Sequence, residues 1–186
     1  MNIGILAVQG AFIEHKKMLE MLGADSFEIR KKEDLDKPID GIILPGGEST
    51  TQGKLIRDLG MHEIIKERIE NGLPVLATCA GLILLAQNLV NDSNIHLATL
   101  PVSVRRNAYG RQLGSFFTNG SFGTLENVPM TFIRAPYIES VSPDVNILSV
   151  VDDNIVGVQY KNQIAVSFHP ELNTDTRVHQ AFLNLI

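Results

Sequence analysis

The stretch that decides the fold is Pro74-Val75-Leu76-Ala77-Thr78-Cys79-Ala80-Gly81-Leu82-Ile83-Leu84-Leu85. An apolar run of strand length ends in a lone cysteine, small residues follow, and an apolar segment with helical periodicity comes next. This order matches a strand–turn–helix nucleophile elbow with cysteine in place of serine. The strained turn of such an elbow needs small side chains two positions before and two after the nucleophile. Here these are Ala77 and Gly81.

Cys79 is therefore a candidate nucleophile. It would lie at the N-terminus of the helix that begins near Ala80, where unpaired N–H groups and the positive end of the helix dipole favour a thiolate. A lone cysteine can equally be a small buried hydrophobic residue without a chemical role. The stretch alone does not separate these two interpretations, so the rest of the chain must decide.

Composition narrows the class of protein. A chain of 186 residues with 44% hydrophobic residues predicts one globular domain over 1–186 with a substantial core. The N-terminal segment 1–8 indicates a buried strand rather than a signal peptide, and no apolar run is long enough to cross a membrane. A net charge of −5 without a basic patch disfavours nucleic-acid binding. The single cysteine fits a reducing compartment, so we expect a cytoplasmic location.

The first half of the chain alternates strand and helix patterns, which predicts a parallel sheet with helices on both faces. The predicted strands cover 3–8, 26–30, 40–44 and 74–78. We expect the charged segment 31–37 to be a solvated loop, and Ser49, Thr50 or Thr51 to cap the helix after the third strand. The helix after the elbow is predicted to continue to about Val90.

After Asn91 the chain changes to short strand-like runs separated by turn residues. They cover 98–104, 112–118, 130–133, 146–151, 155–160 and 163–168. We expect antiparallel additions at one edge of the sheet, and a last strand that returns to its centre and ends at His169-Pro170-Glu171. A terminal helix is predicted over 176–186, with Val178, Phe182, Leu185 and Ile186 facing inward. The predicted fold class is α/β.

Three features follow the carboxyl ends of predicted strands, where open α/β sheets place their sites. They are Gly46-Gly47, Cys79 and His169-Pro170-Glu171. His169 and Glu171 are two positions apart in what we expect to be extended chain, so their side chains can leave on one side. The carboxylate could then hold the far nitrogen of the imidazole while the near one faces the thiol. Alternatively, the tripeptide is a helix entry with Glu171 as a solvated acid.

The Gly46-Gly47 pair also has two interpretations. It can be a tight turn into a capped helix, which is common. It can also let the backbone expose an N–H beside the cysteine. Together with the N–H of Ala80, that group could bind the developing oxyanion of an acyl transfer and lower the barrier by a few kcal/mol.

Taken together, these motifs resemble those of class I, triad-type glutamine amidotransferases. More narrowly, they are similar to the PdxT/SNO family, the glutaminase subunits of pyridoxal 5′-phosphate synthase. The elbow and His-Pro-Glu mark the superfamily, and the resemblance spans nearly the whole chain. The narrower motifs are 6–11, Pro-Gly-Gly-Glu-Ser-Thr at 45–50, Arg-Asn-Ala-Tyr-Gly-Arg-Gln at 106–112 and Phe-Ile-Arg-Ala-Pro at 132–136. The resemblance implies a three-layer, flavodoxin-like sheet with an antiparallel extension.

The resemblance also implies roles for particular residues. Cys79 would attack the side-chain amide of L-glutamine, with His169 as the base and Glu171 orienting it. Gly47 and Ala80 would form the oxyanion hole. The residues implied in binding L-glutamine are Gly47, Glu48, Ser49, Arg106, Ile133 and Arg134. Without the resemblance, the two arginines would be interpreted as surface charges. Gln9, near the predicted site, is a weaker candidate for sensing a partner.

The implied partner is a PdxS-type (β/α)8-barrel synthase subunit assembled as a dodecameric core, because ammonia released into water would be protonated and lost. Pyridoxal phosphate would be the product of that complex, so we expect no cofactor on this chain. No metal is expected either, since the remaining histidines lack ligand spacing. They are His15, His62, His96 and His179.

Three other hypotheses stay open at this point. The chain could be a glutaminase subunit of another pathway, such as histidine biosynthesis, although the flanking motifs argue against it. It could be a cysteine-dependent hydrolase or peptidase of related fold, or a catalytically silent binding subunit. Glutamine hydrolysis with and without the barrel subunit distinguishes the enzymes, and a glutamine-analogue electrophile would fail to label Cys79 in a silent subunit.

Overall fold

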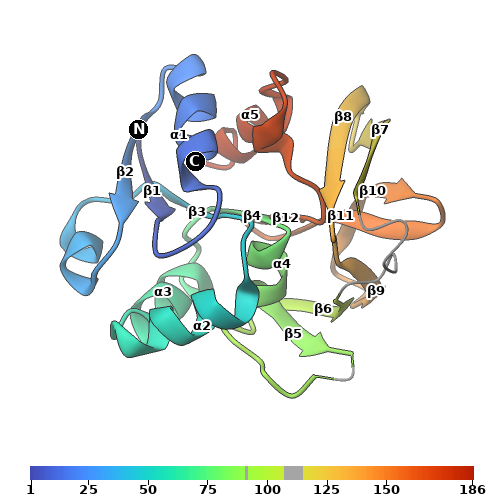
Figure 1. Cartoon of the computed structure of the whole chain (residues 1–186). Coiled ribbons are helices and arrows are strands. Elements are labelled where there is room, and N and C mark those ends of the chain that lie inside the picture. Colours follow the sequence, from blue (N-terminus) through green and yellow to red (C-terminus); the bar gives the residue numbers. More distant parts are fainter. Residues whose placement is uncertain (91, 107–114) are drawn as a thin grey trace.

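A twisted sheet runs through the middle of the computed structural model, which describes residues 1–90, 92–106 and 115–186 (Figure 1). Over these ranges the sheet has ten strands in the order β2-β1-β3-β4-β12-β11-β9-β6-β5, with β10 paired to β11. Strands β7 and β8 form a second, two-stranded sheet. The predicted strand start at 112–114 and residues 107–112 of the motif that begins at Arg106 lie outside the described residues.

The strands are β1 Asn2–Leu6, β2 Asp25–Ile29, β3 Gly41–Leu44, β4 Val75–Thr78, β5 Ala86–Leu89, β6 Leu100–Arg105, β7 Ser115–Phe122, β8 Leu125–Ile133, β9 Tyr137–Val141, β10 Asn146–Val151, β11 Asn154–Tyr160 and β12 Gln163–Val166. The α-helices are α1 Phe12–Met21, α2 Ser49–Asp58, α3 His62–Glu70, α4 Ala80–Leu85 and α5 Arg177–Leu183. Two 3₁₀ helices complete the description, η1 Lys32–Asp36 and η2 Pro170–Leu172.

The predicted parallel half of the sheet is confirmed. Strand β1 pairs in parallel with β2 and β3, and β4 pairs in parallel with β3 and β12. The resulting order β2-β1-β3-β4-β12 is the flavodoxin-like order. Helices α1 and α5 cover one face and α2, α3 and α4 the other, which makes three layers (Figure 1).

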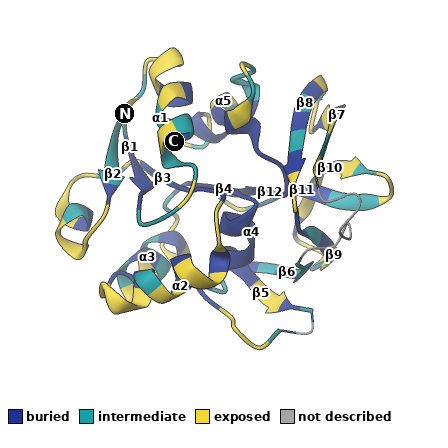
Figure 2. Ribbon diagram, viewed as in Figure 1, coloured by how far each residue is buried: buried dark blue, intermediate teal, exposed yellow. Residues whose placement is uncertain are grey.

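Side chains alternate between the two faces along each parallel strand, as the pleat requires. Ile43 and Leu76 join the core under α1 and α5, whereas Leu44 and Ala77 join the core under α2, α3 and α4. Both faces of these strands are therefore buried, as Figure 2 shows for β3, β4 and β12. This explains why their sequences are continuous apolar runs rather than alternating ones.

The antiparallel extension is also confirmed, with two differences. Strands β11, β9 and β6 continue the sheet beyond β12 with antiparallel pairing. The β7–β8 hairpin, however, stands apart from this sheet and packs Phe122, Met130 and Phe132 against the α1–α5 core. Strand β9 was not predicted, because only Ile138 of its five residues is fully buried and its apolar pattern is weak.

The helix after the elbow ends earlier than predicted. It stops at Leu85, and the next four residues form strand β5, paired in parallel with β6. In that segment Ala86 and Leu89 are buried while Gln87 and Asn88 are exposed. Burial at positions i and i+3 is also what another helical turn would show, so periodicity could not reveal the change.

Three local predictions are wrong. Segment 32–36 is a 3₁₀ helix rather than a loop, because the Asp34 carboxylate accepts hydrogen bonds from the backbone N–H groups of Arg30 and Lys31. The residue that caps α2 is Glu48, rather than one of the three hydroxyl residues after it. Helix α5 ends at Leu183, which leaves Ile186 45% exposed.

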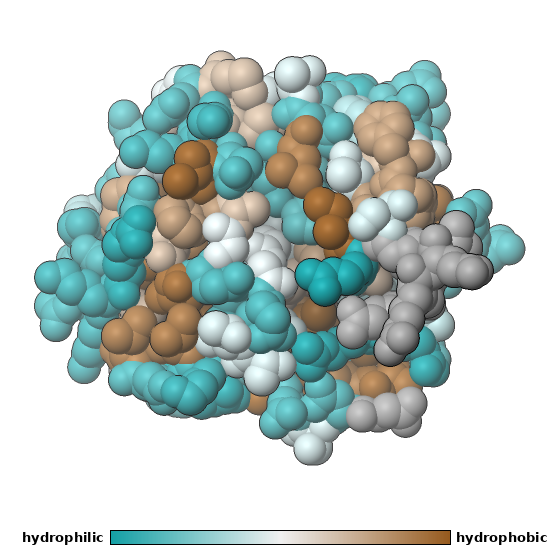
Figure 3. Space-filling view, viewed as in Figure 1, coloured by the Kyte–Doolittle hydropathy of each residue, from teal (hydrophilic) through white to brown (hydrophobic). Residues whose placement is uncertain are grey.

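The surface mixes hydrophilic and hydrophobic residues on the face shown in Figure 3. Within the described ranges, no helix combines the length and the apolar character that crossing a membrane demands.

Candidate active site

Cys79 occupies a strained turn between β4 and α4. Its backbone has φ 48° and ψ −99°, a conformation that L-residues rarely adopt. The Cys79 N–H donates to the carbonyl of Val166 at 2.8 Å, which fixes the turn on the neighbouring strand β12. A Cβ on Gly81 would overlap the carbonyl oxygen of Leu44, so this position requires glycine. The elbow predicted from the sequence is therefore present, with Cys79 only 7% exposed.

His169 reaches the same edge of the sheet because β12 pairs in parallel with β4. Thr78 is opposite Val166 in this pairing, so the residues that follow each strand emerge side by side. The N–H of His169 donates to the carbonyl of Thr131 in β8 at 2.8 Å. This bond anchors the residue to the hairpin as well as to the sheet.

The predicted contact between His169 and Glu171 is present, although its backbone differs from the prediction. Nδ1 of His169 lies 2.7 Å from Oε1 of Glu171. The segment is not extended: it turns into the 3₁₀ helix η2, with Pro170 at its start. Because the Glu171 side chain is completely buried, the alternative of a solvated acid is wrong.

The electrostatics of these groups favour a charged imidazole. Burial lowers the pKa of His169, but hydrogen bonds with Cys79 and Glu171 and the negative charges of both groups outweigh it and raise the pKa to about 10. Burial raises the pKa of Glu171, whereas the facing His15 and His169 lower it, and the net direction is downward. A charged imidazole therefore lies between the sulfur of Cys79 and the carboxylate of Glu171. A positive charge beside a cysteine favours the thiolate, which is its nucleophilic form.

Close contacts constrain both glycines of the loop after β3. A Cβ on Gly46 would overlap the imidazole of His169, and a Cβ on Gly47 would overlap the side-chain oxygen of Gln9. That oxygen also accepts the Glu48 N–H at 2.8 Å. Gln52 donates its side-chain N–H groups to the backbone carbonyls of Gln9 and Pro45 at 2.9 and 3.1 Å. Hydrogen bonds with the side chains of Gln9 and Gln52 thus fix the position of the loop that contains Gly46 and Gly47.

A hollow of about 390 Å³ opens above Cys79. Its lining includes every residue predicted for catalysis, the oxyanion hole and glutamine binding except Glu171, which is buried behind His169. The predicted residues that line it are Gly47, Glu48, Ser49, Cys79, Ala80, Arg106, Ile133, Arg134 and His169. Gln9, Ile83 and Pro136 complete the lining.

Arg106 lines this hollow, so it is not a surface charge remote from the site. Its guanidinium donates to the Asp92 carboxylate at 2.7 Å and reaches Oγ1 of Thr50 at 3.3 Å and the Glu48 carboxylate at 3.5 Å. The hydroxyl and backbone N–H of Thr51 and the N–H of Thr50 stabilise that carboxylate and lower the pKa of Glu48. Arg134, by contrast, is exposed at the end of β8, with φ 44°.

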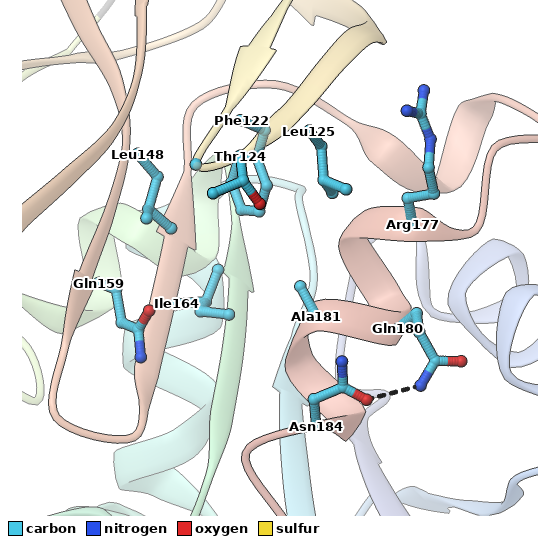
Figure 4. A pocket seen from close by; sticks show the side chains of 11 residues that line it. Phe122, Thr124, Leu125, Leu148, Gln159, Ile164, Arg177, Gln180, Ala181 and Asn184 are labelled. Carbon is cyan, nitrogen blue, oxygen red and sulfur yellow. Dashed lines mark hydrogen bonds between the residues drawn. The ribbon is translucent and has the colours of Figure 1, made fainter.

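A second hollow, of about 300 Å³, lies between α5, the β7–β8 turn and strands β10 to β12 (Figure 4). Two of its polar side chains already make hydrogen bonds. Arg177 donates to Asp175 and to the carbonyls of residues 126 and 127, and Gln180 donates to Asn184 at 2.9 Å. Phe122, Leu148 and Ile164 contribute apolar surface. No catalytic arrangement is present among the residues that line this second hollow.

Three buried polar residues behind Glu171 had no predicted role. They are His15 on α1, Thr78 at the end of β4 and His179 on α5, all 0% exposed. The available signal was weak: His15 falls on the apolar face of its helix, between Phe12 and Leu19. A polar residue on such a face requires a buried partner, but the sequence does not identify that partner.

The parallel α/β sheet with a cysteine at the elbow after its central strand has the fold of class I glutamine amidotransferases. A solved structure described as a glutamine amidotransferase superimposes with a TM-score of 0.94, at 42% identity over 98% of this chain and 97% of that one. The model of the SNO glutamine amidotransferase family matches residues 5–186. The chain belongs to the SNO glutamine amidotransferase family.

Curated relatives agree with this assignment. The pyridoxal 5′-phosphate synthase subunit PdxT of Desulfitobacterium hafniense (strain DCB-2) is 65% identical over 100% of this chain and 94% of its own length. The protein of the same name from Streptococcus pneumoniae serotype 2 (strain D39) is 53% identical over 100% of this chain and 97% of its own. The similarity therefore extends over the whole chain and nearly the whole of each relative.

Proposed function

We propose that this chain is the glutaminase subunit of pyridoxal 5′-phosphate synthase, and that it hydrolyses L-glutamine to L-glutamate and ammonia through a γ-glutamyl thioester on Cys79. The observation that carries the proposal is that Cys79 and His169 lie together at the floor of one hollow, with the buried Glu171 in contact with His169 from behind. The full-length similarity to the two PdxT proteins supports the choice of synthase.

The first half of the reaction forms the thioester. The Cys79 thiolate attacks the side-chain carbonyl carbon of bound glutamine, and the carbonyl oxygen becomes an oxyanion. The backbone N–H groups of Gly47 and Ala80 stabilise that charge, each by about 3 kcal/mol when correctly aligned. His169 then gives its proton to the amide nitrogen, the C–N bond breaks, and ammonia leaves.

The second half regenerates the enzyme. A water molecule replaces ammonia, and neutral His169 takes a proton from it as it attacks the thioester carbon. The C–S bond breaks, glutamate leaves, and the thiolate faces a protonated imidazole again. Glu171 stays ionised throughout and holds Nδ1 of His169, so that Nε2 is the nitrogen that moves protons.

Charged groups on the wall of the hollow suit the free α-amino acid end of glutamine. Arg106 and Arg134 offer guanidinium groups for the α-carboxylate, while Glu48 offers a carboxylate for the α-ammonium. Ser49 and Ile133 line the same hollow. The sides of the hollow therefore select an amino acid, and its floor holds the reacting amide.

Arg106→Met is expected to raise KM for glutamine by about 10- to 100-fold with little change in kcat, because a lost charge-assisted hydrogen bond costs about 1.5–3 kcal/mol. Steady-state glutaminase assays measure both constants. Arg105→Met is the matched control, since Arg105 pairs with Glu139 and does not line the hollow. An unchanged KM in the Arg106 variant would exclude this residue from glutamine binding.

The proposed partner is a PdxS-type (β/α)8-barrel synthase subunit, assembled as a dodecamer, that receives the ammonia before it meets water. This chain needs no cofactor of its own in that scheme, because pyridoxal phosphate is the product. The test is co-purification with the barrel subunit, followed by a glutaminase assay with and without it. We expect a stable complex and a clear increase in glutamine hydrolysis.

Other results would favour the alternatives. Hydrolysis of glutamine without any response to the barrel subunit would indicate a glutaminase of another pathway. Hydrolysis of other amides or peptides would indicate a hydrolase of related fold. A complex without hydrolysis, together with no labelling of Cys79 by 6-diazo-5-oxo-norleucine, would indicate a silent binding subunit.

A further inference from the structure

Two fully buried histidines contact each other beneath the catalytic residues. His15 lies on α1 and His179 on α5, the two helices that cover the same face of the sheet (Figure 1). Nδ1 of His15 is 2.9 Å from Nε2 of His179. Burying an imidazole is costly unless its nitrogens find partners, so the pair calls for an explanation.

The other nitrogen of His15 faces the catalytic carboxylate. Nε2 of His15 lies 3.6 Å from Oε2 of Glu171 and 3.2 Å from the hydroxyl oxygen of Thr78. Oε1 of Glu171 is bonded to His169, whereas Oε2 is buried and has no hydrogen-bond partner among the described residues. Nε2 of His15 thus faces the carboxylate oxygen that lacks a hydrogen bond.

The same hydroxyl connects this cluster to the loop that carries the proposed oxyanion donor. Oγ1 of Thr78 accepts the N–H of Gly46 at 3.0 Å. Gly46 immediately precedes Gly47, and Thr78 immediately precedes Cys79. His15 therefore contacts Thr78, which supports the Gly46-Gly47 loop, and it also faces Glu171, which orients His169.

The positions of the protons follow from burial and from the neighbouring charges. Burial lowers the pKa of His15, and the opposing effects of Glu171 and Glu14 do not reverse it; His169 lowers it further. Burial and His15 hold the pKa of His179 well below its ordinary value. Each ring is therefore neutral and carries one proton.

A bare nitrogen lone pair facing a carboxylate would be repulsive, which places the proton of His15 on Nε2. Its Nδ1 then accepts, and His179 must donate from Nε2. This leaves Nδ1 of His179 as a bare acceptor, and that nitrogen has no partner among the described residues. An unpaired acceptor is more readily tolerated than an unpaired N–H donor. The donors thus run in one direction, from His179 through His15 to Glu171.

We propose that His15 is a positioning residue for the glutaminase reaction. Its Nε2–H lies within hydrogen-bond distance of the Thr78 hydroxyl and faces Oε2 of Glu171 at 3.6 Å, and His179 fixes the tautomer that directs this N–H toward both groups. The proposal rests on the function proposed above. His15 acts only through Glu171 and Thr78, since it does not line the hollow and does not contact glutamine.

The test compares two amides at this position, in the full chain bound to the synthase subunit. The side-chain nitrogen of His15→Gln can take the place of Nε2, whereas that of His15→Asn reaches only the place of Nδ1. We expect His15→Asn to lower kcat by about 10- to 100-fold, the loss typical of a missing outer hydrogen bond, with KM within about 2-fold. His15→Gln should retain kcat within about 3-fold.

A spectroscopic reading on the isolated chain accompanies the kinetics. The proton between His169 and Glu171 should give a strongly low-field ¹H NMR signal, assigned by its absence in His169→Asn. We expect this signal to move or broaden in His15→Asn and to stay in place in His15→Gln. Met18→Leu, a change at a buried position of the same helix, controls for disturbed packing of α1. It should alter neither reading.

Equal effects of the two amides, whether both large or both absent, would overturn the proposal. If His15→Asn does not fold, His179→Leu supplies the second reading, because it keeps His15 but removes its donor. We then expect kcat to fall several-fold with KM unchanged, and an unaltered kcat would overturn the proposal. Failure of the proposed function looks different, since the wild-type chain would itself lack glutaminase activity in the complex.

Discussion

Cys79→Ala is expected to abolish glutamine-dependent synthesis of pyridoxal phosphate by the complex and to leave synthesis from added ammonium salt intact. Without the sulfur no thioester forms, and loss of a covalent nucleophile typically costs at least about 10⁴-fold in rate. The synthase subunit still receives ammonia from solution, so its own chemistry continues. Pyridoxal phosphate formation from each nitrogen source is the measurement.

The fold should survive this change. Alanine keeps the Cβ, so the backbone strain at φ 48° should be the same as in the wild type. The sulfur that is lost lines the hollow, so its removal leaves no closed cavity. Because the chain has one cysteine, a glutamine-analogue electrophile should add once to the wild type and not at all to the variant. Loss of both synthetic activities would mean that Cys79 matters for structure rather than as the nucleophile.

His169→Asn is expected to slow thioester formation by about 10²–10⁴-fold, the usual contribution of a positioned acid–base group. The asparagine amide can still donate to Glu171, so the buried carboxylate keeps a partner and the chain should fold. Rapid-quench measurement of the covalent intermediate reports the step directly. Thermal melting serves as the control for folding.

The same variant should change how alkylation of Cys79 depends on pH. With a pKa raised from 6.5 to about 10, His169 stays charged beside the sulfur until the solution approaches pH 10. That charge favours the thiolate, so alkylation of the wild type by iodoacetamide should depend less steeply on pH between about pH 7 and about pH 9 than alkylation of the variant. In His169→Asn it should be at least about 10-fold slower at pH 7 and rise with pH. Identical profiles would show that the imidazole does not sustain a thiolate.

The elbow could be predicted from sequence because its signals are local. A strand-length apolar run, a cysteine and small residues on either side occupy one short segment, and the Gly81 contact with Leu44 explains why that pattern is needed. The contact between His169 and Glu171 was predictable for the same reason, even though η2 replaces the extended chain. Only the motifs shared with a known family, however, suggested the roles of Arg106 and Arg134.

The features that escaped prediction have other physical causes. Glu48 caps α2 because its side chain accepts hydrogen bonds from the backbone N–H groups of Thr50 and Thr51. N-cap propensities favour Ser, Thr, Asp and Asn instead, so they indicated the hydroxyl residues that follow. The strand after Leu85 has a burial pattern that a helical turn would share. The partners of His15 lie 63 and 164 positions away, so nothing near it in the chain could identify them.

The pairing of β4 with β12 has a consequence for the chain during its synthesis. On the ribosome, the segment with the sulfur emerges long before the segment with its imidazole, and the strand that joins them is among the last to be made. A nascent or prematurely terminated polypeptide that lacks β12 has a thiol but no proton acceptor beside it. We therefore expect an unfinished chain of this kind to release no ammonia from glutamine.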